Sequence, residues 1–233
     1  MIYSTTSFLH RIGNHVIVYF IPLMLSCSDK TLSTPEIWKL ENLEEIGGHK
    51  PLILGNPQVV KDEYGLSLSF NGIDDGLILP VNPVASFEQF TVEVLFKPDA
   101  DGLAQQRFVH FQDENNNRGL IETRLLPDGR WFLDTYLHDG KTDSGLTLAD
   151  RSLLHPAGQW YWAALVYDGE TMTHYLNGQK EDEGGIIFGP MSEGKMSVGV
   201  RLNQVFWYKG LIRELRFHEQ ALDEKQLRVP GNN

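Results

Sequence analysis

The sequence predicts an all-β protein in which two antiparallel sheets pack face to face as a jelly-roll sandwich. Short runs rich in Val, Ile, Phe, Tyr and Trp place apolar side chains at every second position, which is the period of a strand with one buried face. Turn-forming Asn-Gly and Asp-Gly steps separate many of these runs. The steps are Asn71-Gly72, Asp128-Gly129, Asp139-Gly140, Asp168-Gly169 and Asn177-Gly178. About ten such strands suit two sheets that bury alternate side chains between them.

The predicted strands follow from this alternation and from the turns that bound it. Asn71-Gly72 separates the first two strands, Asp128-Gly129 the fifth from the sixth, and Asp168-Gly169 the seventh from the eighth. In chain order the strands span 66–70, 76–79, 90–97, 107–112, 119–126, 131–138, 160–167, 171–176, 196–200 and 210–218. The one helical candidate is a short turn near 221–227.

Composition excludes several classes of protein. The chain has 233 residues, of which 41% are hydrophobic and 22% charged, and this is ordinary for a globular domain. Its formal net charge is −11 and it has no basic run, so nucleic acid is not an expected partner. A single cysteine rules out an internal disulfide, and a domain of this size holds its core by burial alone.

The amino-terminal segment predicts a secretory signal over residues 1–26. Arg11 precedes an apolar run from Val16 to Leu25, and the composition turns polar directly after Ser26-Cys27. A membrane-spanning helix is the competing interpretation, but it needs about 20 apolar residues, and this run is roughly half as long.

The end of this run, Met24-Leu25-Ser26-Cys27, resembles a bacterial lipobox. The resemblance implies cleavage before Cys27 and acylation of its thiol, which predicts a lipid-anchored protein of the bacterial cell envelope, at the outer membrane or cell surface. The alternative is an ordinary cleaved signal peptide in which Cys27 is incidental. Residues 27–35 then form a tether, 36–229 the jelly-roll domain and 230–233 a tail.

Five segments of the domain carry a family resemblance. They are Ser69-Phe-Asn-Gly-Ile-Asp-Asp75, Phe90-Thr-Val-Glu-Val-Leu-Phe-Lys-Pro98, Trp160-Tyr-Trp-Ala-Ala-Leu-Val-Tyr-Asp-Gly169, His174-Tyr-Leu-Asn-Gly178, and Gly210-Leu-Ile-Arg-Glu-Leu-Arg-Phe217 followed by Ala221-Leu222. In order and spacing they are similar to the laminin-G-like jelly rolls of the concanavalin A-like lectin/glucanase superfamily, over residues 64–228. The resemblance implies the fold. Because that superfamily includes lectins, adhesive modules, glycoside hydrolases and polysaccharide lyases, function has to be inferred from the sheet face.

The same alternation predicts which side chains point away from the core. In 107–112 it places Val109 and Phe111 inward and Phe108 and His110 outward. If the remaining strands neighbour one another in one sheet, with His110 and Arg201 beside them, its open face holds Glu122, Arg124, Asp134, Tyr136, His138, Trp162 and Tyr175. Aromatic rings stack on sugar C–H faces, while hydroxyls donate paired hydrogen bonds to planar carboxylates and accept them from guanidinium groups. The alternative is that these charges merely pair across strands and solubilise the face.

Carbohydrate binding without chemistry is therefore the leading functional prediction, with polysaccharide or another glycan as partner. An enzyme on the same face is the first alternative: Glu122 and Asp134 would serve a glycoside hydrolase, and Arg124, Tyr136 and His138 a polysaccharide lyase. The glucanase Glu-x-Asp-x-x-Glu motif and the Gln-Ile-His motif of the alginate-lyase-like branch are absent.

A protein-adhesion module is the second alternative, with Phe206-Trp207-Tyr208 as an exposed apolar loop. The competing interpretation of these three aromatic residues is that they are core at a strand edge.

A calcium ion is an optional ligand. Asp74 and Asp75 lie where many laminin-G-like domains have an acidic loop, whose oxygens suit Ca²⁺. Arg213 takes the place of an acidic residue of the family pattern and leaves only Glu214 beside it. The competing interpretation is that both aspartates form the turn by binding their own backbone. No cofactor is required.

Overall fold

The computed structural model describes residues 8–12, 15–19, 34–62 and 64–231, in two separate units. In the first, Met1–Leu32, strands β1 (Phe8–Ile12) and β2 (His15–Tyr19) pair as an antiparallel hairpin. Cys27 and its neighbours lie outside the described residues, so acylation stays a prediction. In the described part of the chain no helix is long and apolar enough to cross a membrane.

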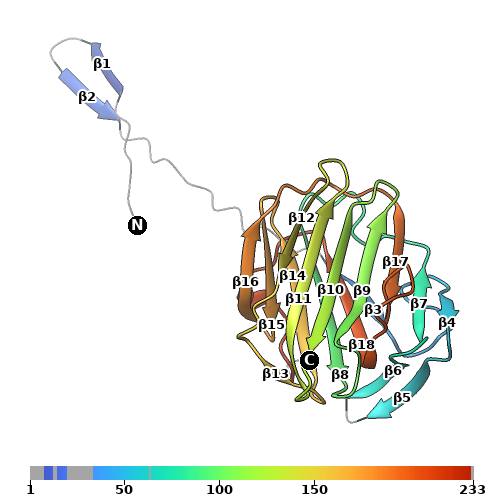
Figure 1. The fold of residues 1–233 in the computed structure, drawn as a ribbon. Coiled ribbons are helices and arrows are strands. Elements are labelled where there is room, and N and C mark those ends of the chain that lie inside the picture. The colour runs from blue at the N-terminus through green and yellow to red at the C-terminus, as the bar shows by residue number, and fades with distance from the viewer. Residues whose placement is uncertain (1–7, 13–14, 20–33, 63, 232–233) are drawn as a thin grey trace. The chain divides into compact units, whose positions relative to one another are not determined.

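The second unit, Ser33–Asn233, is the predicted antiparallel sandwich (Figure 1). The first sheet, called sheet I, has the order β12 (Ser144–Leu148), β11 (Arg130–Asp139), β10 (Arg118–Leu125), β9 (Gln105–Asp113), β17 (Gly194–Val198), β7 (Gly76–Leu79), β4 (Leu52–Leu54), with β13 (His155–Pro156) on β11. The second, sheet II, has the order β16 (Gln179–Gly185), β15 (Thr171–Leu176), β14 (Tyr161–Tyr167), β8 (Phe90–Pro98), β18 (Lys209–His218), β6 (Gly65–Asn71), β5 (Gln58–Asp62), with β3 (Glu36–Lys39) on β18.

All ten predicted strands are present, and the structure adds shorter or more polar ones that the alternation missed. Besides the hairpin of β1 and β2, the added strands are β3, β4, β5, β12, β13 and β16. The sequence of β16, Gln-Lys-Glu-Asp-Glu-Gly-Gly, is typical of an edge strand that charge protects from pairing further. A single 3₁₀ turn over Glu224–Gln226 lies where the short helical turn was predicted.

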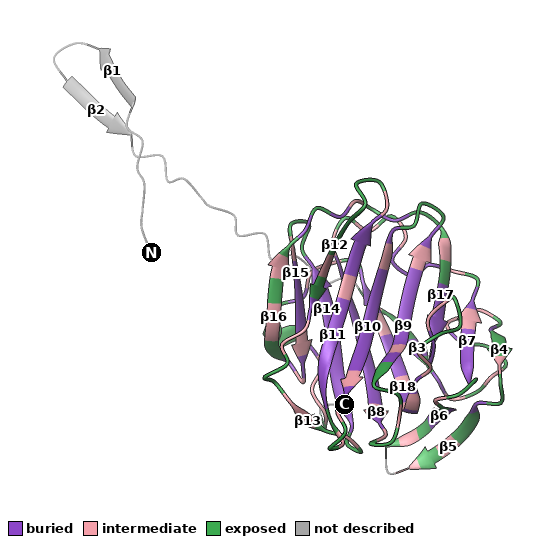
Figure 2. Cartoon of the chain, viewed as in Figure 1, coloured by how far each residue is buried: buried purple, intermediate pink, exposed green. Residues whose placement is uncertain are grey.

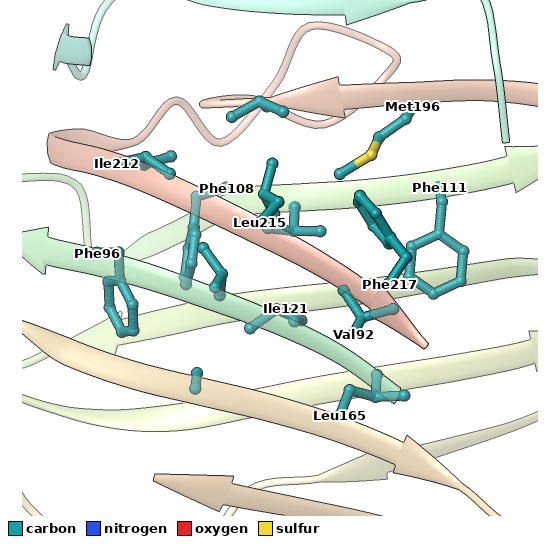
Figure 3. Close-up of a cluster of buried hydrophobic side chains, with 14 of the residues drawn as sticks. Val92, Phe96, Phe108, Phe111, Ile121, Leu165, Met196, Ile212, Leu215 and Phe217 are labelled. Atoms are coloured by element: carbon teal, nitrogen blue, oxygen red, sulfur yellow. The ribbon is translucent and has the colours of Figure 1, made fainter. Parts of the chain in front are cut away.

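The core lies between the two sheets, and side chains of both fill it (Figure 3). Phe96 of β8 meets Phe108 of β9 with ring centroids 4.6 Å apart, and Phe90 meets Phe111 edge to face at 5.9 Å. One polar pair also crosses the core. The Thr135 hydroxyl of β11 lies 2.9 Å from Nδ1 of the fully buried His174 of β15.

A β-bulge interrupts the alternation in β9. Ile121 of β10 pairs with Val109, but the next residue, Glu122, pairs with Arg107, so Phe108 is the extra residue. Phe108 is fully buried in the core beside Val109. The prediction that Phe108 points outward is therefore wrong, because the bulge turns two successive side chains inward. As a consequence, Arg107 lies on the outer face of sheet I.

Part of the outer face of sheet II is covered by the carboxy-terminal segment. Leu222 and Leu227 pack on outward side chains of β14. The backbone N–H of Arg228 donates to Glu93 Oε1 on β8, and the Nε2 of His218 lies 2.9 Å from the other oxygen of Glu93. Every residue of β14 and all but one of β8 are buried, which agrees with this covering (Figure 2).

Candidate functional site

The predicted site residues separate onto the two sheets. Glu122 and Arg124 of β10 lie on the outer face of sheet I, and so do three residues of β11, namely Asp134, Tyr136 and His138. Trp162 of β14 and Tyr175 of β15 belong to sheet II. The grouping of all seven on one sheet face is therefore wrong. Alternation places a side chain on one side of its strand, but it does not say which sheet the strand joins.

The two aromatic residues of sheet II differ in exposure. Trp162 is 6% exposed, packs with Leu95 and Trp160, and has the Arg216 guanidinium 5.4 Å from its ring centroid, so it offers no open stacking surface. Tyr175 is partly buried against the cluster of Leu222 and Leu227 and lines a separate cavity of about 820 Å³ on sheet II.

On sheet I the strand register sets polar residues around an apolar floor. Leu120 of β10 lies between Tyr136 of β11 and His110 of β9, and it is buried. Above this floor is a cavity of about 230 Å³, called the arginine cavity. Its lining residues are Arg107, Arg118, Leu120, Glu122, Arg124, Asp134, Tyr136, Thr147 and Arg201.

An ion-pair network fixes two of the arginines of the cavity. Arg107 Nε donates to Glu122 Oε1 at 2.7 Å, and Arg124 Nε donates to Asp134 Oδ2 at 2.6 Å. Arg124 Nη2 also lies 3.2 Å from Glu122 Oε2. Burial, and then the charge of Asp134, raises the pKa of Glu122, while burial raises the pKa of Asp134. The guanidinium groups oppose these shifts, and the network holds Arg107 and Arg124 in one orientation.

Two further arginines of the cavity have no carboxylate partner among the described residues. Arg118 donates from Nη1 to the Asn116 Oδ1 at 2.7 Å, its guanidinium lies 5.6 Å from the Tyr136 ring centroid, and its buried Nε has no partner. Arg201, from the loop after β17, has no ion pair. Burial lowers the pKa of Arg201, with a further contribution from the positive charges of Arg107 and Arg118. The cavity thus holds four guanidinium groups and two carboxylates, in a chain whose net charge is −11.

His110 is a neutral, buried histidine beside the cavity. It is 1% exposed, and its Nδ1 accepts the backbone N–H of Leu202 at 3.0 Å, so the ring proton lies on Nε2. Burial, together with Arg201, Arg118 and Arg107, lowers the pKa of His110 to about 3, and a side-chain hydrogen bond with Gln112 opposes this lowering.

A second, wider cavity adjoins the first. Its volume is about 790 Å³, and Arg201 lines both cavities. His110, Gln112 and Asn203 supply neutral polar groups to it. Its charged lining consists of Asp113, Glu114, Glu193, Lys195 and Arg201. The lining residues of the two cavities together extend across sheet I from Thr147 of β12 to Leu52 of β4.

His138 lies behind the cavity wall and supports Tyr136. The two rings stack with an interplanar angle of 22°, and the Tyr136 hydroxyl lies 3.2 Å from His138 Nδ1. Burial lowers the pKa of His138, and Arg118 adds to this lowering. Tyr136 lines the arginine cavity while His138 does not.

Asp74 and Asp75 make the hydrogen bonds of a turn. Asp75 Oδ1 accepts the backbone N–H of Asn56 at 2.7 Å and Oδ2 accepts that of Asn71 at 3.0 Å, while Asp74 Oδ1 accepts the side-chain amide of Asn71. In the described ranges, no cluster of three or more His, Cys, Asp or Glu residues is placed to hold a metal ion. These contacts fit the turn-forming interpretation, and calcium binding stays a prediction.

The aromatic loop contributes to core and site rather than to an exposed patch. Tyr208 is fully buried, as the core interpretation of this loop predicted. Phe206 lies under Arg107, with the guanidinium carbon 3.9 Å from its ring centroid, and its carbonyl accepts the Arg107 backbone N–H. Phe206 thus supports the orientation of Arg107.

Sequence reasoning missed four lining residues for identifiable reasons. Arg107 was hidden by the bulge, and Arg118 lies one residue before the predicted strand 119–126. Extending the alternation of Glu122 and Leu120 back by two positions would have found Arg118. Leu120 was left out because it is apolar, and Thr147 because β12 was not predicted.

A family model described as "Concanavalin A-like lectin/glucanases superfamily", of the laminin-G group, matches residues 71–228. The chain belongs to this family. A search of curated proteins by sequence finds no match.

Several solved structures share the fold. Domain 4 of AbnA, a GH43 extracellular arabinanase from Geobacillus stearothermophilus, in complex with arabinotriose, is 22% identical with a TM-score of 0.63, covering 84% of this chain and 97% of that one. The ligand-binding domain of botulinum neurotoxin serotype D in complex with N-acetylneuraminic acid is 15% identical with a TM-score of 0.60, covering 82% of this chain and 48% of that one. The binding domain of Paraclostridial Mosquitocidal Protein 1 is 15% identical with a TM-score of 0.61, and the match covers 82% of this chain and 50% of that one.

Proposed function

We propose that this protein binds an oligosaccharide on the outer face of sheet I, with one sugar unit in the arginine cavity. The observation that carries the proposal is a cavity whose planar charged groups are already fixed by Glu122 and Asp134 above an apolar floor. Two structures of similar fold hold arabinotriose and N-acetylneuraminic acid, and this supports a glycan as the ligand.

The cavity offers hydrogen-bond donors to the oxygen atoms of a sugar and apolar surface to its C–H faces. Guanidinium N–H groups donate to ring and hydroxyl oxygens, and their fixed geometry reduces the entropy lost on binding. Leu120 and the ring of Tyr136 offer apolar surface to C–H faces. Trp162 and Tyr175, on sheet II, take no part in this mode of binding.

Binding without catalysis fits the carboxylates better than hydrolysis or elimination does. Glu122 and Asp134 lie directly opposite each other on β10 and β11, and each accepts a hydrogen bond from an arginine that pins it. A general acid or base has to exchange a proton with the substrate, which this pinning opposes. The enzyme alternative is tested in the same samples, because new reducing ends or an unsaturated product would establish turnover.

The experiment measures retention of the full chain on a panel of immobilised polysaccharides, with Ca²⁺ and with EDTA, while the supernatant is assayed for released product. Tyr136→Ala removes a wall of the cavity and is expected to lower retention at least tenfold. Tyr175→Ala is the matched control on sheet II and is expected to bind as the wild type does. Thermal unfolding verifies that both variants are folded. Equal loss in both variants, or loss only in Tyr175→Ala, would refute the location of the site.

We further propose that acylation of Cys27 anchors the protein in a bacterial envelope. The lipobox-like residues before Cys27 support this. Metabolic labelling with a fatty-acid analogue in a bacterial host tests it: the wild type is expected to take up the label and partition with membranes, and Cys27→Ala to do neither. A wild type that stays unlabelled would favour an ordinary cleaved signal peptide.

A further inference from the structure

We infer that the arginine cavity receives the carboxylate of an acidic sugar, and that neutral sugar units follow it into the adjoining cavity. The inference rests on the proposed function and narrows the ligand to one chemical class. Three observations carry it: the charges of the two cavities, the two arginines without an acidic partner, and the buried Nε donor of one of these arginines.

The arginine cavity has an excess of positive charge, although the chain as a whole is acidic. The four arginines of the cavity face only two carboxylates, and these neutralise Arg107 and Arg124. Arg118 and Arg201 therefore supply two positive charges that no acidic side chain of the described residues matches. Both arginines are half-buried, so a ligand anion at this place gains hydrogen bonds and compensates charges that water screens only in part.

The guanidinium group of Arg118 suits a small planar anion. Its Nε is buried and has no partner among the described residues. Guanidinium forks match a carboxylate bidentately. A volume of about 230 Å³ corresponds to about eight water molecules, which leaves room for one sugar unit.

The adjoining cavity has no excess of positive charge. Its open charges are the carboxylates of Glu114 and Glu193 against Lys195 and the shared Arg201, because Asp113 is buried and its carboxylate accepts hydrogen bonds from Asn117 and Ser192. Because Arg201 compensates the first carboxylate, a second acidic sugar placed there would meet two carboxylates against one lysine. The ligand that suits both cavities has one carboxylate at one end and neutral units beyond it, in contrast to a homopolymer in which every unit is acidic.

The test uses matched pairs of soluble glycans and isothermal titration of the full chain. The pairs are lactose against 3′-sialyllactose, and xylotriose against glucuronic-acid-substituted xylotriose. Trigalacturonic acid represents the all-acidic chain, and lactose 3′-sulfate a different anion. At least one acidic member is expected to bind at least tenfold more tightly than its neutral partner and than the all-acidic chain.

The variants identify the groups responsible. Arg118→Gln and Arg201→Gln are each expected to lower the affinity for the acidic glycan about tenfold or more and to lower the affinity for its neutral partner by a clearly smaller factor. Arg201→Lys is expected to restore part of the loss. Arg130→Gln is the control, because Arg130 is exposed and pairs with Asp128 away from both cavities. Thermal unfolding verifies that each variant is folded.

The outcomes separate this inference from the proposed function. Neutral glycans that bind as tightly as their acidic partners, with no effect of either glutamine variant, would overturn the acidic-sugar assignment and leave glycan binding intact. Tightest binding of the sulfate would overturn the carboxylate, and tightest binding of trigalacturonic acid would overturn the neutral second subsite. Absence of binding to every glycan in both experiments would overturn both proposals.

Discussion

Acid will destabilise this protein through His174, the histidine buried between the two sheets. His174 is fully buried, and its one hydrogen bond among the described residues is to Thr135 of the opposite sheet. Burial lowers the pKa of His174 to about 4, and the charges of Asp182 and Asp150 oppose this lowering only in part. In the unfolded chain the same side chain titrates near its ordinary value of 6.5. Between pH 6.5 and about pH 4, the unfolded state therefore binds a proton at this side chain and the folded state does not.

The sign and size of the effect follow from these two pKa values. The contribution is fully present above pH 6.5 and is lost as the pH falls from 6.5 toward 4, where the folded protein is protonated as well. The loss is about 1.36 kcal/mol for each pH unit in this window, so His174 removes about 2.5 kcal/mol of unfolding free energy between pH 7.5 and pH 4.5. His110, whose pKa is lowered to about 3, adds a similar loss in the same interval.

Urea unfolding at a series of pH values measures this, with His174→Gln as the perturbation. Glutamine keeps a polar partner for the Thr135 hydroxyl but does not titrate. We expect the difference in unfolding free energy between variant and wild type to change by about 2.5 kcal/mol between pH 7.5 and pH 4.5, in favour of the variant at low pH. Thr135→Val removes the hydrogen bond but keeps the histidine, so its pH profile should parallel that of the wild type. Parallel profiles for His174→Gln and the wild type would refute the reasoning.

Three further substitutions test other parts of the structure. Glu122→Gln leaves Arg107 and Arg124 without their shared anion. We expect it to lower the unfolding free energy by about 3 kcal/mol in urea titrations and to abolish glycan retention. An unaltered stability would mean that the network does not order the site. Asp75→Ala deprives two backbone N–H groups of their acceptor and should cost about 2 kcal/mol equally in Ca²⁺ and in EDTA, whereas a loss seen only in Ca²⁺ would indicate a bound ion. Phe108→Ala leaves a cavity in the core and should cost about 3 to 5 kcal/mol in the same titrations; a cost below about 1 kcal/mol would show that the bulge side chain is not packed.

Local patterns in the sequence predicted the strands well because each strand carries its own alternation. Where one face of a strand is buried, a shift by one residue would expose the entire apolar set, so sequence and structure agree on β8, β10, β11 and β14. The exception in β9 is instructive, because Phe108 and Val109 are both apolar and the sequence does not mark which residue is the extra one.

The site could be predicted only in part, because its composition depends on contacts between distant segments. The register of β10 and β11 brings Glu122 opposite Asp134, as the alternation indicated. Which of the two sheets a strand joins cannot be read from its alternation. The path of the chain after β13 places β14, and with it Trp162, in the sheet opposite Glu122 and Asp134. Arg201 comes from a loop whose position no strand pattern describes.

The contrast between the acidic chain and its basic cavity has a kinetic consequence. Beyond about 10 Å, the Debye length at 0.1 M salt, an approaching acidic glycan experiences mainly the net charge of −11, which repels it. Within that distance it meets the unpaired charges of Arg118 and Arg201, which attract it. Added salt screens the long-range repulsion that slows association of the glycan. It also weakens the ionic contacts that slow its dissociation. Association and dissociation rates should therefore both rise with ionic strength, so that bound and free glycan exchange faster at high salt than at low salt.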